Sequence, residues 1–209
     1  MSKTIKLYRH PLSGHSHRVE LFLSLLELPY ELIDIDLING EHKQPGFLSK
    51  NIFAEVPVID DDGTIVSDSN AILVYLASKY DSSRHWLPED PAFAAEVQRF
   101  LSVAAGQVAF GPAAARLVNV FGAQLDHEAA RARANELLNT LDKHLAARDF
   151  LAGPVTIADI ACYTYIAHAP EGDVSLEPYP NVRAWLERIT LLPNYVPRQS
   201  PAVGLAAGA

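Results

Sequence analysis

Two short phrases in the first third of the chain constrain its fold most: EVPVI at residues 55–59 and DSNAI at residues 68–72. A proline at the start of a strand has no N–H for the ladder, so Pro57 belongs at a strand edge or a turn. If the bond before Pro57 is cis, the backbone of Val56 faces outward and can pair with an added extended peptide. The second phrase is typical of a helix start, whose free N–H groups attract a carboxylate. Together the phrases predict a pocket for a short peptide that carries a carboxylate.

Length and composition set the class of protein. The 209 residues are enough for one large or two small domains, and 49% apolar with 20% charged residues is close to a soluble globular average. No apolar run approaches the ~20 residues that cross a bilayer, and a strand pattern begins almost at the N-terminus, so we expect no membrane span and no secretory signal. A net charge of −8 without a Lys/Arg cluster argues against nucleic-acid binding.

Cysteine usage points to a compartment. The single Cys162 excludes an internal disulfide and fits a reducing, cytoplasmic location. It lies within a helical pattern, where an inert buried thiol is the usual case.

The first 80 residues alternate strand-like and helical patterns. We expect strands over 5–8 and 30–37, a helix over 16–27, a hairpin from 56–60 and 63–66, and a helix over 69–80. This order, β-α-β followed by β-β-α, predicts a compact unit in which helices cover a sheet.

The remainder reads as helical. The first helix is expected to begin at Pro91, after a cap at Asp90, with a kink or break at Pro112. Three more helices are expected: one after Asp126, one opened by the TIAD capping box at 156–159, and one from Asn181. The sequence therefore divides into an α/β domain over 1–81, a linker over 82–90 and an all-helical domain over 91–209. The small residues from 204 to 209 form a tail that is expected to fray.

Five motifs in this order resemble the glutathione transferases, and the resemblance covers nearly the whole chain. The first is the loop YRHPLSGHSHRV (8–19), which is similar to the serine-type catalytic loop of the family. The second is residues 40–48, which are similar to a glutathione-contacting segment of phi-type members. The other three are the Val-Pro and Asp-Ser phrases, TIAD (156–159) and PYPNVRAW (178–185). The serine type suggests phi- or theta-like bacterial members. The resemblance implies an α/β thioredoxin-like N-terminal domain, an all-α C-terminal domain, and a cytoplasmic homodimeric detoxification enzyme.

The resemblance also implies the chemistry, in which the glutathione thiolate attacks an apolar electrophile and Ser13 donates a hydrogen bond to the sulfur. A free thiol has a pKa near 8.5, so lowering it by about two units takes roughly 2.7 kcal/mol. One charge-assisted hydrogen bond contributes roughly 1.5–3 kcal/mol, so a single hydroxyl at a helix start is of the right size. Ser16 competes with Ser13 for this role, and either one is able to cap the helix. Tyr8 is the tyrosine-type alternative, but it falls within the strand pattern.

The other ends of glutathione are assigned by the same resemblance. It implies that the backbone of Val56, followed by a cis Pro57, pairs with the cysteinyl residue of glutathione. It also implies that Asp68 and Ser69 bind the γ-glutamyl end, and that His42 and Lys43 bind the glycine carboxylate. Three residues depart from the family pattern: Asp68 replaces glutamate, Ile52 replaces proline, and Glu55 places a negative charge near the glycine carboxylate. We therefore expect modest affinity for glutathione.

Three histidines in the first loop suggest a possible metal site. His10, His15 and His17 lie near one another in sequence, with Asp34 or Asp36 further on, but their spacing matches no compact ligand set. No metal is expected, and His15 and His17 are interpreted as polarising the site or as solvated.

The electrophile is expected in the cleft between the domains, a common place for ligand pockets. Leu12, Phe110, Ala113 and Arg116 are candidate lining residues, although the last three fit a helical core equally well. Alternative functions on the same fold are a glutathione-dependent peroxidase, disulfide reductase, dehalogenase or isomerase, or a non-catalytic glutathione-binding module.

Overall fold

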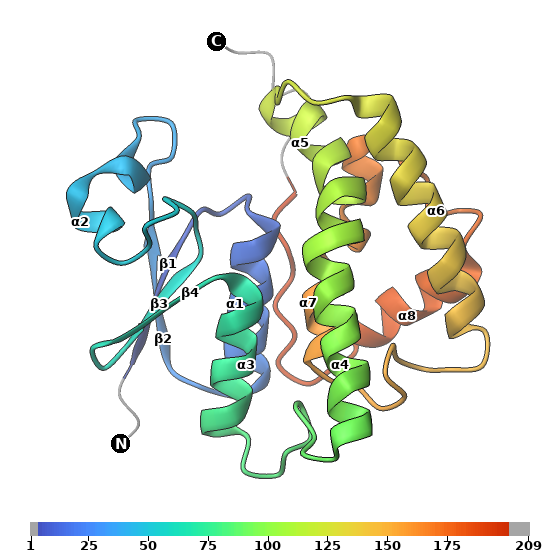
Figure 1. Cartoon of the computed structure of the whole chain (residues 1–209), viewed down its shortest axis with the longest axis horizontal. Coiled ribbons are helices and arrows are strands. Elements are labelled where there is room, and N and C mark those ends of the chain that lie inside the picture. The colour runs from blue at the N-terminus through green and yellow to red at the C-terminus, as the bar shows by residue number, and fades with distance from the viewer. Residues whose placement is uncertain (1–3, 201–209) are drawn as a thin grey trace. The chain divides into compact units, whose positions relative to one another are not determined.

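The structure, a computed structural model, describes residues 4–200 (Figure 1). Its contacts divide the chain into two compact units. One holds the chain up to Leu87 together with Leu192–Gln199, and the other holds Pro88–Leu191.

The first unit is built on a four-stranded mixed sheet. Its strands are β1 (Ile5–Arg9), β2 (Tyr30–Asp34), β3 (Val58–Asp61) and β4 (Thr64–Ser67), in the order β2-β1-β3-β4. β1 runs parallel to β2 and antiparallel to β3, and β4 returns antiparallel to β3. The helices are α1 (Gly14–Leu25) and α3 (Ser69–Tyr80), with the short η1 (Glu41–Lys43) and α2 (Pro45–Leu48) between β2 and β3. The expected thioredoxin-like arrangement is confirmed.

Apolar residues from the sheet and both helices form the core of this unit. Leu7 of β1, Phe22 of α1, Ile59 of β3 and Leu73 of α3 are each fully buried. Helix α3 has the bounds that its sequence predicted, because its cap and its apolar spacing are both local signals.

Two elements end earlier than expected. β2 stops at Asp34 rather than at residue 37, because Asp36 turns the chain: its carboxylate accepts hydrogen bonds from Asn39, and its N–H donates to Glu41. α1 covers residues 14–25 rather than 16–27, since Glu27 adopts a positive φ of 54° that does not continue a right-handed helix.

The hairpin is shifted by one or two residues from its expected position. β3 starts at Val58, after the proline that has no N–H to donate. Asp62 and Gly63 form the turn with φ of 53° and 88°, the backbone that a two-residue hairpin loop requires.

The second unit is helical, as expected. It contains α4 (Pro91–Val103), the π-helical η2 (Ala104–Ala113), α5 (Ala114–Phe121), α6 (His127–Leu145), α7 (Ile157–Ala167), η3 (Ala169–Gly172) and α8 (Pro180–Thr190). Pro112 lies inside the π-helical stretch and does not end the helix, which continues to Gly122 at a φ of 66°. Proline has no N–H to donate to a helical bond, and the chain around Pro112 is π-helical rather than α-helical.

The predicted capping box is confirmed at the start of α7. The Thr156 hydroxyl accepts from the helix backbone, and buried Asp159 accepts from the N–H of Thr156, the N–H of Leu151 and the indole of Trp185. Burial raises the pKa of Asp159 to about 6, against the effect of these donors. α8 begins at Pro180, one residue before the expected start.

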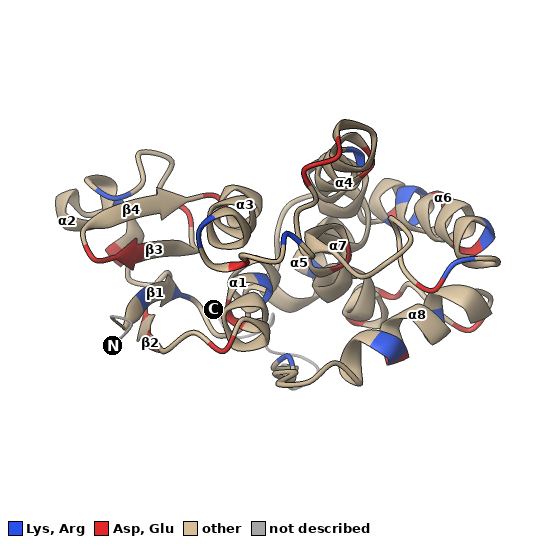
Figure 2. Ribbon diagram, turned by 90° about the horizontal axis from the view of Figure 1, so that it is seen from below, with Lys and Arg blue, Asp and Glu red and all other residues tan. Residues whose placement is uncertain are grey.

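One helical stretch, Pro91–Phe121, is long and apolar enough to cross a membrane by length and composition alone. Half of its most apolar window is buried inside the protein, which is typical of a core helix. Figure 2 shows Lys and Arg interspersed with Asp and Glu along α6 and in the first unit, rather than gathered in one basic surface of the described residues.

Candidate active site

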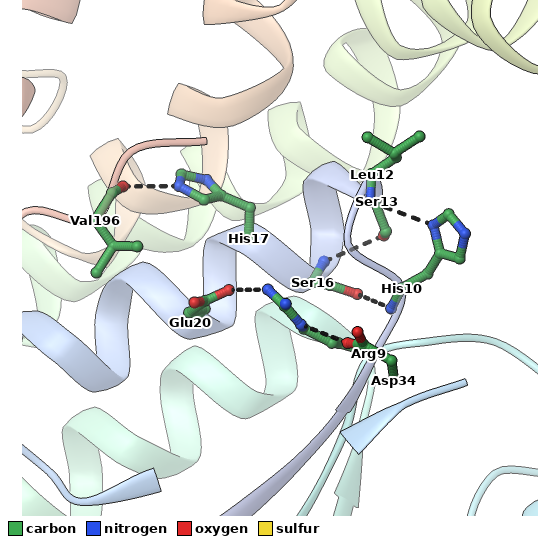
Figure 3. Close-up of polar contacts among 9 residues, drawn as sticks. All are labelled: Arg9, His10, Leu12, Ser13, Ser16, His17, Glu20, Asp34 and Val196. Carbon is green, nitrogen blue, oxygen red and sulfur yellow. Dashed lines mark hydrogen bonds and ion pairs between the residues drawn. The ribbon is translucent and has the colours of Figure 1, made fainter. Parts of the chain in front are cut away.

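Ser13 caps α1 at the end of the loop that follows β1. Its Oγ accepts a hydrogen bond from the N–H of Ser16 at 3.2 Å, and its own N–H donates to the carbonyl of His10 at 2.9 Å (Figure 3). Ser16 is buried, and its Oγ accepts from the N–H of His10 at 3.3 Å. The structure therefore makes Ser13 the cap and Ser16 a support for the loop. An Oγ that accepts from an amide keeps its own proton for another partner.

Arg9 fixes the base of this loop. Its Nη1 lies 2.6 Å from a Glu20 carboxylate oxygen on α1, and its Nε lies 2.8 Å from Asp34 at the end of β2 (Figure 3). Burial raises the pKa of Glu20, and the guanidinium of Arg9 opposes that rise. The ring of His10 adds a further tie, because its Nδ1 accepts from the N–H of Leu12 at 3.3 Å.

His17 joins α1 to the segment that returns from the C-terminal side. Its Nε2 lies 2.9 Å from the carbonyl oxygen of Val196, so this nitrogen carries the proton (Figure 3). The pKa of His17 is lowered to about 4, chiefly by burial and also by the charges of Arg198 and Arg9. The hydrogen bond with Val196 opposes this lowering. The ring is therefore neutral at physiological pH and serves as a structural donor.

A cavity of about 430 Å³ lies beside the start of α3. It is lined by His15, Asn51, Phe53, Glu55, Val56, Pro57, Ser67, Asp68 and Ser69. The Val56–Pro57 peptide bond is cis. The structure thus brings together Val56, Pro57, Asp68 and Ser69, the four residues that the two sequence phrases placed in a peptide pocket. Ser13, His42 and Lys43 are not among these lining residues.

The start of α3 presents two different side chains to this cavity. Asp68 is exposed, has a φ of 70°, and caps the helix by accepting from the N–H of Ala71 at 2.8 Å. Ser69 is only 3% exposed, and its Oγ lies 2.7 Å from Nη1 of Arg18 and 3.1 Å from Nδ1 of His15.

Arg18 is a buried residue beside the candidate site to which sequence reasoning assigned no role. The loop motif includes Arg18 without a role, yet the structure buries it and directs its Nη1 to Ser69 and, at 2.8 Å, to Oδ1 of Asn70. These contacts join α1 to the first turn of α3 across more than 50 residues. No local pattern signals such a pairing, although His15 and Arg18 stand three residues apart on one helix face.

The segment η1 carries His42 and Lys43. Lys43 is exposed. His42 is partly buried, and within residues 4–200 its buried Nδ1 has no hydrogen-bond partner.

The remaining candidates lie elsewhere. Leu12 is partly buried in the loop between β1 and α1, and Tyr8 lies in β1 as expected. Phe110 is 62% exposed and lines a cavity of about 800 Å³ formed by α4, η2 and α6 of the helical unit. Ala113 and Arg116 are buried in that unit, where Nε of Arg116 lies 2.6 Å from Glu171. Contact of these residues with an electrophile stays a prediction.

A thiol and a metal centre are the other chemical groups that a site can use. Cys162 is buried, with Sγ 3.6 Å from the carbonyl oxygen of Phe100. No group of three His, Cys, Asp or Glu side chains among residues 4–200 is arranged to hold a metal ion.

Comparisons with known proteins agree with this architecture. The model of the glutathione S-transferase N-terminal domain matches residues 3–78, and that of the C-terminal domain matches residues 91–188. The chain is 34% identical to glutathione S-transferase 3 of Zea mays, covering 91% of each chain. It is 32% identical to glutathione S-transferase theta-2 of Rattus norvegicus, covering 88% of this chain and 80% of the relative.

Solved structures give the same result. A glutathione S-transferase from Pseudomonas fluorescens superimposes with a TM-score of 0.88 at 30% identity, covering 95% of this chain and 100% of that chain. A glutathione transferase homologue from Drosophila mojavensis, solved with bound glutathione, gives a TM-score of 0.81 at 28% identity, covering 92% and 90% of the two chains.

Proposed function

The chain belongs to the glutathione S-transferase family, and from this premise we propose that Ser13 activates the glutathione thiol for attack on an apolar electrophile. One observation carries the proposal: the Ser13 Oγ accepts from the N–H of Ser16 and so retains its own proton as a donor. The sulfur would lie near the N-terminus of α1, whose dipole also favours negative charge. Ser13 acts as a hydrogen-bond donor and forms no covalent bond to the substrate.

The cavity beside α3 supports a binding mode for the tripeptide. Val56 lines this cavity, and its backbone pairs with the cysteinyl residue as an added strand would. The γ-glutamyl end binds at the start of α3, where Ser69 meets its carboxylate and Asp68 meets its ammonium group.

The glycine end binds at η1 in this proposal. His42 offers a buried Nδ1 that has no partner in the described part of the chain, and Lys43 offers an exposed ammonium group. Glu55 lines the cavity beside α3 and opposes an anionic ligand there. Affinity for glutathione is therefore modest.

The rest of the proposal concerns the second substrate and the assembly. The electrophile is apolar and meets Leu12 beside the sulfur, with Phe110, Ala113 and Arg116 as candidates from the helical unit. We also propose a cytoplasmic detoxification enzyme that forms a homodimer.

Calorimetric titration tests the proposal directly. Reduced glutathione should bind saturably between micromolar and millimolar concentrations, and S-hexylglutathione should bind more tightly because its alkyl chain occupies the apolar subsite. No binding of either ligand would refute the proposed site. Equal affinity for the two would refute the apolar neighbour alone.

A further inference from the structure

The hydroxyl of Ser69 lies between two nitrogen groups of α1. Nη1 of Arg18 is 2.7 Å from its Oγ, and Nδ1 of His15 is 3.1 Å from the same atom. Ser69 and His15 both line the cavity beside α3. The hydrogen bonds that this oxygen makes with Arg18 and His15 therefore determine whether the Ser69 proton is available to a ligand in the cavity.

A serine hydroxyl has one proton to donate and two lone pairs to accept with. A guanidinium group only donates, so Arg18 occupies one lone pair. A neutral imidazole nitrogen either donates or accepts, depending on the tautomer. If Nδ1 of His15 accepts, the Ser69 proton is consumed inside the protein. If Nδ1 donates, the second lone pair is filled and the Ser69 proton points elsewhere.

We propose that His15 donates from Nδ1 to Ser69, so that Ser69 acts only as a donor into the cavity and selects a ligand with a carboxylate at this point. His15 is in this view a positioning residue. The inference rests on the proposed function and deepens it, because it gives a physical basis for recognition of the γ-glutamyl carboxylate by this chain.

The charges around the cavity favour this arrangement. Asp68 and Glu55 both line the cavity, so an anionic group there needs a strong donor. Arg18 supplies the positive charge, and its contact with Ser69 polarises the hydroxyl toward a bound anion. Burial, with the nearby charge of Arg18, lowers the pKa of His15 to about 3. The ring is thus neutral at physiological pH and can hold one fixed tautomer.

The test compares two ligands on three variants of the full chain. The ligands are reduced glutathione and its analogue with 4-aminobutyrate in place of the γ-glutamyl residue, which lacks only the α-carboxylate. His15→Leu removes the donor, and His15→Asn keeps an amide N–H at a similar distance from the backbone. His85→Leu is the matched control, because His85 is exposed in the linker and lines neither cavity.

We expect His15→Leu to weaken glutathione binding about five- to tenfold, the size of one hydrogen bond, while the affinity for the analogue changes less than about twofold. His15→Asn should restore glutathione binding to within about twofold of the wild type. His85→Leu should leave both affinities unchanged. Two-bond ¹H–¹⁵N correlation spectra of the glutathione complex should show His15 protonated on Nδ1.

Three results would overturn the inference while the wild type still binds glutathione. An Nε2-protonated His15 in the complex would reverse the hydrogen bond. An equal loss of affinity for both ligands in His15→Leu would show a merely structural role. Unchanged glutathione affinity in that variant would remove any role for His15 while leaving the proposed function intact. If the wild type binds no glutathione, the proposed function fails first and the inference fails with it.

Discussion

Replacing Ser13 with alanine separates two roles that the structure gives to one hydroxyl. The Oγ accepts from the N–H of Ser16, which stabilises α1, and its proton is the proposed donor to the sulfur. Loss of a charge-assisted hydrogen bond worth about 1.5–3 kcal/mol raises the pKa of the bound thiol by about one to two. At a pH below both pKa values, kcat/KM should therefore fall about 10- to 100-fold.

The capping role predicts a separate and smaller effect. The Ser13–Ser16 contact is 3.2 Å, at the long end of the range for such bonds, so Ser13→Ala should lower the free energy of unfolding by only about 1 kcal/mol. Asp126→Ala is the matched control. Asp126 caps α6 by accepting from Ala129 at 2.9 Å, so its loss should lower stability similarly without changing the bound thiol.

The assay is a pH titration of the ultraviolet absorbance of bound glutathione thiolate, with kcat/KM measured on a standard aryl halide electrophile. Ser13→Ala should shift the thiolate titration upward, and its rate deficit should shrink as the pH rises through the new pKa. An unchanged pKa of the bound thiol in Ser13→Ala would refute the reasoning and turn attention to other donors near the start of α1.

Three further predictions follow from particular contacts. Glu55→Gln should tighten glutathione binding about two- to fivefold, because it removes a negative charge from the cavity wall; unchanged or weaker binding by calorimetry would remove that idea. His17 has a folded pKa of about 4, below its unfolded value, so the unfolded state binds the extra proton and stability is lost as the pH falls from about 6.5. The neutral buried state of His17 therefore costs about 2 kcal/mol of folding free energy at pH 5. His17→Gln keeps a donor to Val196, so its free energy of unfolding, measured by denaturant titration, should depend less steeply on pH than that of the wild type. An equally steep pH dependence in the variant would contradict the prediction. Gly172→Ala should lower the melting temperature by several degrees, because the new Cβ would lie 2.6 Å from the backbone N of Arg116; an unchanged melting temperature would show that η3 moves without cost.

The parts of the fold that followed from the sequence are those with short-range causes. The bounds of α3 and the capping box of α7 were predicted correctly, because a cap and the helical spacing behind it lie within one window of sequence. The end of β2 was not predicted correctly, because it depends on the hydrogen bonds of Asp36 with Asn39 and Glu41, which form only after the chain has turned. The break expected at Pro112 does not occur, because the chain there is π-helical, and π-helical bonding has no simple sequence signal.

The candidate site divides in the same way. Val56, Pro57, Asp68 and Ser69 belong to two compact phrases, and the structure places all four on one cavity wall. The contacts of Ser69 with Arg18 and His15 join residues 51 and 54 positions apart, and only the packing of α1 against α3 creates them. The residues that hold a functional side chain in place are therefore harder to predict from sequence than the functional side chain itself.

The return of Leu192–Gln199 to the first unit has a consequence for how this chain is synthesised. Besides the tie between His17 and Val196, the Ser24 hydroxyl donates to the carbonyl of Asn194, and the Asn194 side chain donates to Glu27. An N-terminal half emerging from the ribosome, or expressed as a fragment, would lack the two contacts on α1 and the one at Glu27 just after it. The helix that carries the proposed catalytic serine at its start thus reaches its final environment only when nearly the whole chain has been translated.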